Sequence, residues 1–240
     1  MVRVLFSLAV FWFFPSCNKN ETKEIIYVPP KDTVSFSSGD TAKTYLALGD
    51  SYTIGQSVSQ SERFPAQTNV FLKGDGIKMS EPIYIAQTGW TTANLLSAIA
   101  AQNPLPVFDV VTLLIGVNDQ YQRMDTGGYT QRFTQLLEKS IQLAKGRKMN
   151  VFVLSIPDYS ATPFVPEAEK PRVKSEIDLF NAVNKRITES YGVSYTDITP
   201  SSRQAATNTA LISSDNLHPS GTEYNKWAQM LGPKIKAALK

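Results

Sequence analysis

The sequence predicts an α/β protein: a three-layer α/β/α sandwich around a five-stranded parallel sheet of flavodoxin-like type. Short apolar runs alternate along the chain with longer segments in which apolar residues recur every three or four positions. The apolar runs lack the polar alternation of a half-exposed strand, so they indicate strands buried on both faces, as in parallel sheets. Parallel strands need crossover connections, and the intervening segments are therefore expected to be helices on both faces of the sheet.

The expected elements occupy residues 43–240. Strands are expected at 45–48, 82–86, 109–115, 151–156 and 193–198. Helices are expected at 91–102, 129–145 and 173–191, with a last helix from Ser220. Ser220-Gly-Thr-Glu223 has the spacing of a capping box. In this motif the serine side chain accepts a backbone N–H while the glutamate reaches back to the cap.

The first 42 residues differ from this domain. Arg3 precedes an apolar run, residues 4–14, that is too short to span a bilayer as a helix. Residues 1–16 are expected to be an export signal that resembles a bacterial lipoprotein signal. Residues 17–42 are then the lipid-anchor cysteine, Cys17, and a polar tether. An ordinary cleaved signal, or an anchor helix with a bystander cysteine, is the alternative. We expect an exported cell-envelope protein, on the periplasmic or surface side, that contacts the membrane only through this anchor.

Composition narrows the chemistry. The formal net charge of +3 is spread along the chain, so nucleic acid is not an expected partner. The single cysteine excludes a disulfide within the chain, and the single histidine, His218, must serve any mechanism that uses imidazole. No Walker loop, dinucleotide-binding fingerprint or Gly-x-Ser-x-Gly elbow occurs, and Asp and Glu do not cluster at metal-ligand spacing. We therefore expect no cofactor and no metal.

Four short blocks lie where the expected strands end or where the last helix begins. They are Gly-Asp-Ser-Tyr-Thr at 49–53, Gln-Thr-Gly-Trp at 87–90, Gly-Val-Asn-Asp at 116–119 and Asp-Asn-Leu-His-Pro at 215–219. Ligand sites of parallel sheets lie beyond the carboxyl ends of the strands, so the blocks are expected to converge there. Each block alone is equally a turn signal; their joint occurrence is what favours a catalytic site.

Together the blocks hold the groups that acyl transfer requires. Ser51 is the candidate nucleophile and His218 its base, with Asp215, three residues earlier, placed to fix the imidazole tautomer. The backbone N–H groups of Ser51 and Gly89 and the side-chain amide of Asn118 are the candidate oxyanion donors. The neighbouring carboxylates in the first and third blocks are expected to brace their loops.

The four blocks resemble, in the same order, the signature blocks of SGNH/GDSL hydrolases, and they span residues 49–218. The resemblance implies the SGNH hydrolase fold for the 43–240 domain and a serine-dependent esterase activity. It implies nucleophile, oxyanion and base roles for Ser51, Gly89, Asn118 and His218. The first block reads Ser-Tyr-Thr where the name-giving motif has Ser-Leu.

The expected substrate is a small-molecule, glycan or lipid ester. Tyr52, Trp90, Tyr121 and Tyr159 are candidate substrate-binding residues, and the connection 159–172 is a candidate lid or rim. Deacylation of carbohydrate esters, for example acetyl esters, is the first choice, and lysophospholipid or short-chain lipid ester hydrolysis is the second. A non-catalytic surface protein that binds its ligand in the same cleft, and acyl transfer to an acceptor other than water, remain alternatives. The sequence predicts no oligomeric state.

Overall fold

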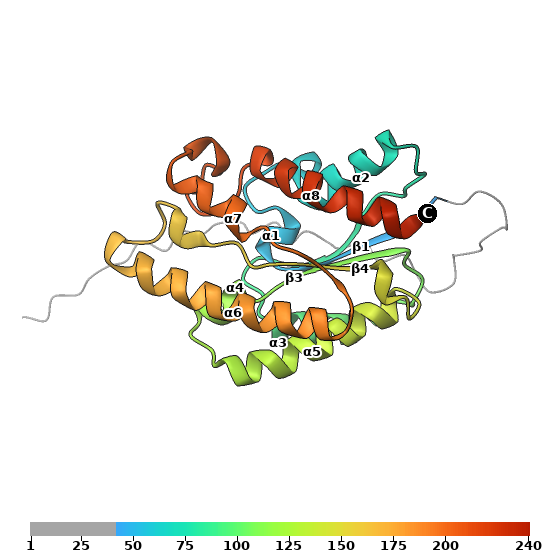
Figure 1. Cartoon of the computed structure of the whole chain (residues 1–240), viewed down its shortest axis with the longest axis horizontal. Helices are drawn as coiled ribbons and strands as arrows, with labels where there is room; N and C mark the ends of the chain where they lie inside the picture. The colour runs from blue at the N-terminus through green and yellow to red at the C-terminus, as the bar shows by residue number, and fades with distance from the viewer. Residues whose placement is uncertain (1–41) are drawn as a thin grey trace, which may run out of the picture.

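The computed structural model describes residues 42–240, and Figure 1 shows the arrangement of their elements. One parallel sheet forms the middle layer, with the strand order β2-β1-β3-β4-β5. This is the flavodoxin-like order, and it confirms the predicted fold class. The strands are β1 (Tyr45–Gly49), β2 (Ile83–Ala86), β3 (Val110–Leu114), β4 (Val151–Leu154) and β5 (Ser194–Thr196).

Helices cover both faces of the sheet. In Figure 1, α3, α5 and α6 lie on one face, and α2 and α8 lie together on the other. Short helices follow three of the strands: two of them are described with the site, and the third, α7 (Thr199–Ser202), follows β5. The long helices are α2 (Phe64–Gly74), α3 (Thr92–Gln102), α5 (Thr126–Leu143), α6 (Lys170–Ser190) and α8 (Gly221–Leu239).

The central strands are buried along their whole length, which is why their sequences are almost entirely apolar. Every residue of β1, β3 and β4 is buried, including Leu46, Leu48 and Leu113 with no exposed surface. Each such side chain contributes about 1.5–3 kcal/mol relative to an exposed position. β1 pairs with β2 and β3, so the strand that precedes Ser51 lies inside the sheet.

Two helices begin earlier than expected. α5 begins at Thr126 instead of residue 129, because Asp125 caps it by accepting the Gly128 N–H at 2.7 Å. α6 begins at Lys170 instead of residue 173, with Pro171 in its first turn, where proline is tolerated. The connection from residue 159 therefore ends at 169, and it contains two 3₁₀ turns, η3 (Tyr159–Ala161) and η4 (Glu167–Glu169).

The expected capping box at α8 is only half formed. Ser220 Oγ accepts the Glu223 N–H at 3.4 Å, as expected. The prediction that Glu223 reaches back to the cap is wrong, because its Oε1 accepts the Trp227 indole N–H at 2.7 Å. Trp227 is fully buried, and a buried indole N–H needs an acceptor.

Within residues 42–240, no helix is both long and apolar enough to cross a membrane. The expected export signal, the lipid-anchor Cys17 and nearly all of the tether lie outside the described residues.

Candidate active site

Three of the four sequence blocks meet at the carboxyl ends of the strands. Ser51 opens α1 (Ser51–Ile54) directly after β1, and Asn118 lies in α4 (Val117–Tyr121) after β3. His218 lies three residues before α8. These three side chains line one open pocket of about 450 Å³. The other residues that line the pocket are Tyr52, Val117, Tyr121, Tyr159, Phe164 and Leu217.

The chain turns sharply from β1 into α1 around Ser51. A Cβ on Gly49 would collide with the Thr53 side chain and the Leu114 carbonyl, so only glycine fits at the end of the strand. Asp50 caps α1 by accepting the Tyr52 N–H at 3.0 Å. The turn leaves Ser51 at the first position of the helix, with its side chain facing the pocket.

Asp50 itself is fully buried. Burial raises the pKa of its carboxyl to about 8; the Tyr52 N–H lowers it and the charge of Asp119 raises it further. Its Oδ2 has no hydrogen-bond partner among the residues that the structure describes. Asp50 is therefore mostly neutral at pH 7, and it supports the turn, as the sequence predicts.

The side chain of Asp215 fixes the orientation of His218. His218 Nδ1 lies 2.6 Å from Asp215 Oδ2, while Asp215 Oδ1 accepts the backbone N–H groups of Leu217 and His218, both at 2.9 Å. Burial raises the pKa of Asp215, but hydrogen bonds from Ser57 and His218 outweigh it and hold that pKa below its usual range. With the carboxylate ionised, Nδ1 carries the proton, which leaves Nε2 as the basic nitrogen.

Two of the three candidate oxyanion donors, Gly89 and Asn118, lie on neighbouring loops. Asn118 Nδ2 donates to the Trp90 carbonyl at 3.0 Å, which orients the amide and leaves its second N–H free to bind another acceptor. Gly89 has a φ of +82°, a conformation that favours glycine, and it is exposed one residue before Trp90. Gly89 is not among the residues that line the pocket.

Asp119 braces the loop that carries Asn118. Its fully buried carboxylate accepts the Thr92 N–H at 2.8 Å, the Thr92 hydroxyl at 2.5 Å and the Arg132 guanidinium at 3.2 Å. These contacts join α4 to the start of α3 and to α5. The bracing role that the sequence predicts for this carboxylate is therefore confirmed.

An aromatic cluster forms one side of the pocket. The rings of Tyr121, Tyr159 and Phe164 lie 6.2–6.4 Å apart, and Tyr121 and Phe164 are 57% and 44% exposed. The Tyr159 hydroxyl donates to Gln120 at 2.8 Å. Of the four candidate substrate-binding aromatics, Trp90 is the one that does not line the pocket; it is half-buried and packs against the core.

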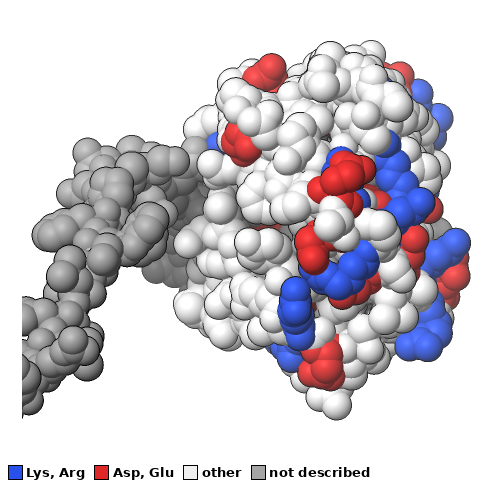
Figure 2. Space-filling model, turned by 90° about the vertical axis from the view of Figure 1, so that its left-hand side faces the viewer, with Lys and Arg blue, Asp and Glu red and all other residues white. Residues whose placement is uncertain are grey.

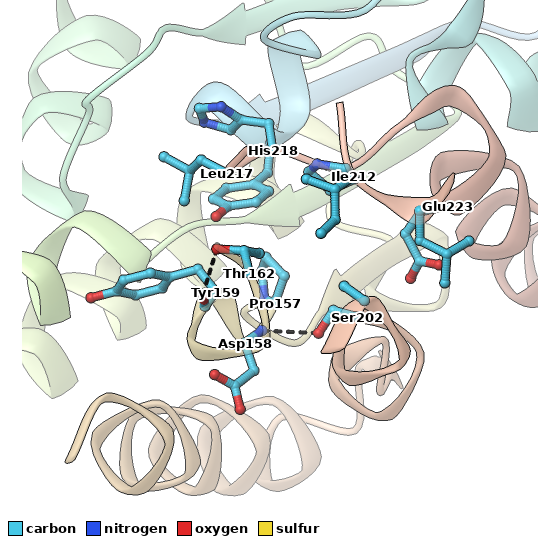
Figure 3. Close-up of a pocket in the computed structure, with 13 residues that line it drawn as sticks. Pro157, Asp158, Tyr159, Thr162, Ser202, Ile212, Leu217, His218 and Glu223 are labelled. Atoms are coloured by element: carbon cyan, nitrogen blue, oxygen red, sulfur yellow. Dashed lines mark hydrogen bonds between the residues drawn. The ribbon is translucent and has the colours of Figure 1, made fainter. Parts of the chain in front are cut away.

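A second, smaller cavity lies behind the imidazole. Figure 3 shows His218 at one end of it and, at the other, Asp158, whose backbone N–H donates to Ser202 at 2.9 Å. The Tyr52 ring lines both cavities and lies 5.1 Å from the imidazole. The loop before α8 is also tied to the 159–169 connection, because Phe164 N donates to Asn216 O at 3.2 Å. His218 is thus held by contacts on several sides.

Sequence reasoning missed three contributors to the site. Val117 and Leu217 line the pocket, and each is adjacent to a predicted functional residue, so the blocks themselves were the available signal. Ser57 donates to Asp215 Oδ2 at 2.6 Å, and no motif marks it. Among residues 42–240, no group of three His, Cys, Asp or Glu residues is placed to hold a metal ion.

The chain matches the model of the GDSL-like Lipase/Acylhydrolase family over residues 47–225. Curated proteins give no match. Solved structures of the same fold include a lipase from a goat rumen metagenome, with 20% identity and a TM-score of 0.67 over 83% of this chain and 100% of that one. A psychrotrophic esterase from Pseudoalteromonas sp. has 18% identity and a TM-score of 0.60, covering 82% of this chain and 98% of its own.

A catalytic mutant of an acetylxylan esterase from Geobacillus stearothermophilus also has 18% identity, with a TM-score of 0.58 over 84% of this chain and 96% of that one. At these identities the structural likeness shows the fold alone. The family match covers most of the chain, and members of the family are serine ester hydrolases. The chain therefore belongs to the GDSL-like lipase/acylhydrolase family and is a serine ester hydrolase.

Proposed function

We propose that the chain hydrolyses carboxylic esters through an acyl-enzyme on Ser51. The Ser51 oxygen attacks the ester carbonyl carbon while His218 Nε2 takes the hydroxyl proton. The tetrahedral intermediate collapses, and the same proton passes to the leaving alcohol. Water then attacks the acyl-enzyme with His218 again as base, which releases the acid and restores Ser51.

The Asp215 carboxylate stabilises the imidazolium that forms in each half-reaction, and the 2.6 Å contact with Nδ1 supports this role. We assign the oxyanion hole to the backbone N–H groups of Ser51 and Gly89 and the second N–H of the Asn118 amide. The tie between that amide and the Trp90 carbonyl supports the assignment, because a donor fixed in advance stabilises charge without reorganisation.

For the substrate, we propose a short acyl ester, such as an acetyl ester, of a neutral carbohydrate. The observation that carries this proposal is that none of the residues that line the pocket is Lys, Arg, Asp or Glu. Residues 55–61, 87–91 and 204–214, in the loops after α1, after β2 and before His218, contain no Lys, Arg, Asp or Glu. Figure 2 views the molecule from the left-hand side of Figure 1, and the charged residues lie mainly over the centre and right of that face. An anionic headgroup that binds in the pocket would need a complementary cation in its lining.

The loop groups suit a hydroxyl-rich ligand instead. They present serine and threonine hydroxyls and glutamine and asparagine amides, which can both donate and accept hydrogen bonds. The exposed rings of Tyr121 and Phe164 offer apolar faces on which the C–H face of a sugar can pack. That a structural neighbour is an acetylxylan esterase agrees with this substrate class at the level of the fold. Short-chain lipid esters are the second candidate, because Val117 and Leu217 add apolar surface to the pocket.

Hydrolysis of p-nitrophenyl esters of increasing acyl length, by the full-length chain and by Ser51→Ala, tests the reaction. Acetic acid release from an acetylated oligosaccharide, against fatty acid release from lysophosphatidylcholine, tests the substrate class. We expect serine-dependent turnover that falls sharply beyond acetate, and acetic acid from the oligosaccharide. Retention of activity on long chains would turn the proposal to lipids. Turnover that survives Ser51→Ala would refute the mechanism, and binding without turnover would favour a non-catalytic protein. A new ester in place of free acid would indicate acyl transfer.

We also propose that the enzyme is exported and anchored in the cell envelope through a lipid on Cys17. The apolar run that ends shortly before this cysteine supports the proposal. Membrane fractionation of the wild type and of Cys17→Ala, expressed in a bacterium, tests it. We expect the wild type with the membranes and the variant in the soluble fraction. An unchanged distribution would contradict lipid anchoring at this residue.

A further inference from the structure

The turn that follows α1 contacts the loop that carries Asp215 and His218. The contact is at the carboxylate of Asp215. Ser57 Oγ donates to Asp215 Oδ2 at 2.6 Å, and this is the same oxygen that lies 2.6 Å from His218 Nδ1. Oδ2 therefore binds the imidazole and a serine hydroxyl together. Hydrogen bonds of this length to an ionised oxygen are charge-assisted and stronger than neutral ones.

Ser57 differs in origin from the other donors to this carboxylate. Among residues 42–240, the Asp215 carboxylate takes part in five hydrogen bonds, and the four others come from within its own loop: Ser213 Oγ, Leu217 N, His218 N and His218 Nδ1. Ser57 belongs instead to the segment that begins with Ser51. Its hydroxyl thus joins the loop of the nucleophile to the loop of the base, 158 positions apart in the chain.

The backbone at Ser57 supports a specific role. Ser57 has a φ of +68°, in the left-handed region that costs a residue with a side chain about 1–2 kcal/mol. Such conformations persist where surrounding structure holds them, and they cluster at functional sites. The preceding residue, Gln56, contacts the loop that carries Gly89. Its Oε1 accepts the hydroxyl of Thr88, one residue before Gly89, at 2.6 Å. The turn of residues 56–57 therefore contacts both the loop that carries Gly89 and the loop that carries Asp215 and His218.

We infer that Ser57 is a positioning residue for the ester hydrolase. Its hydroxyl fixes the rotation of the Asp215 carboxylate relative to Ser51, and through it the orientation of the His218 imidazole. The carboxylate needs such a restraint because 29% of its side chain is exposed to water, which competes for the same oxygens. This inference rests on the proposed roles of Ser51, His218 and Asp215.

Two variants separate the hydroxyl from the backbone. Ser57→Ala removes the hydroxyl and keeps the constraint on φ, whereas Ser57→Gly removes the hydroxyl and relieves the constraint. We expect both to lower kcat for p-nitrophenyl acetate by about tenfold with KM unchanged, since a hydrogen bond to a charged group is lost at the catalytic carboxylate. Ser61→Ala is the matched control, because the hydroxyl of this nearby exposed serine hydrogen-bonds only to the Ser59 hydroxyl within residues 42–240. It should match the wild type.

A double-mutant cycle tests whether Ser57 acts through Asp215. In the Asp215→Ala background, Ser57→Ala should have no further effect on kcat; a merely structural role would lower kcat in both backgrounds and overturn the inference. Wild-type kcat in either Ser57 variant, as when water replaces the hydroxyl, would also overturn it. Failure of the proposed function is distinguishable, because full activity of Ser51→Ala or Asp215→Ala would refute the catalytic roles themselves, whatever Ser57 does.

Discussion

Replacing Asn118 with alanine tests how the oxyanion hole is built. The Asn118 amide donates one N–H to the Trp90 carbonyl at 3.0 Å, and we propose that the other N–H binds the substrate oxygen. Asn118 sits on α4, whose next residue, Asp119, is buried and held by three hydrogen bonds. The amide is therefore fixed before substrate arrives, which is the condition under which such a donor contributes most.

The substitution removes two interactions of different size. Loss of the hydrogen bond to Trp90 should lower the free energy of unfolding by about 0.5–1.5 kcal/mol. Loss of one preorganised oxyanion donor raises the barrier by about 2.7–4 kcal/mol, which lowers kcat by about 10²–10³-fold. A domain of ordinary stability, about 5–15 kcal/mol, tolerates the first change, so the second should be measured on folded protein.

The assay is kcat and KM for p-nitrophenyl acetate, together with the urea midpoint, for the wild type, Asn118→Ala and Gln122→Ala. Gln122 is an exposed residue at the end of the same short helix and is the matched control. We expect a large loss of kcat in Asn118→Ala alone, with a small shift in the midpoint. A folded Asn118→Ala variant with kcat within about threefold of the wild type would refute the assignment of this amide to the oxyanion hole.

Three further substitutions test the supports of the site through urea unfolding. Burial raises the pKa of Asp50 to about 8, so its proton is held by the native state and released by the unfolded state between about pH 4 and 8. Stability should therefore fall with rising pH in that window, by up to about 1.4 kcal/mol per unit, and Asp50→Asn should flatten the fall; an equal slope in both proteins would contradict this. Asp119→Ala removes the acceptor of three hydrogen bonds and should lower the free energy of unfolding by about 3–5 kcal/mol. An unchanged urea midpoint would disprove this. Glu223→Ala leaves the buried Trp227 indole N–H without its acceptor and should cost about 1–3 kcal/mol; a loss well below this range would show that the bond contributes little.

The strands could be predicted because burial on both faces leaves a continuous apolar run, as in Val151–Leu154. Helix α2 was not predicted, because its buried face is not continuously apolar. Its buried face includes the polar residues Thr68 and Asn69, while Val70, an apolar residue, is 68% exposed. The apolar periodicity that indicates the other helices is therefore weak in α2. This helix is identified only in the structure, where it packs against α8.

The candidate site was accessible from the sequence where a residue's role follows from its own block. Asp215 and His218 are three positions apart, so a local turn brings them together. Ser57 could not be found in this way, because its partner is 158 positions away and the contact depends on how two loops meet. For Glu223, a local rule gave the wrong partner. The capping-box spacing predicted a bond to the Ser220 N–H, but the carboxylate accepts the buried Trp227 indole N–H instead.

Covalent labelling tests most directly whether His218 activates Ser51 as a nucleophile. A fluorophosphonate forms a P–O bond with an activated serine oxygen and releases fluoride, and mass spectrometry of the digested protein locates the adduct. We expect one adduct per chain, on Ser51, absent in Ser51→Ala and formed at least about 10²-fold more slowly in His218→Ala. An adduct on a different serine, or labelling of His218→Ala at the wild-type rate, would contradict it.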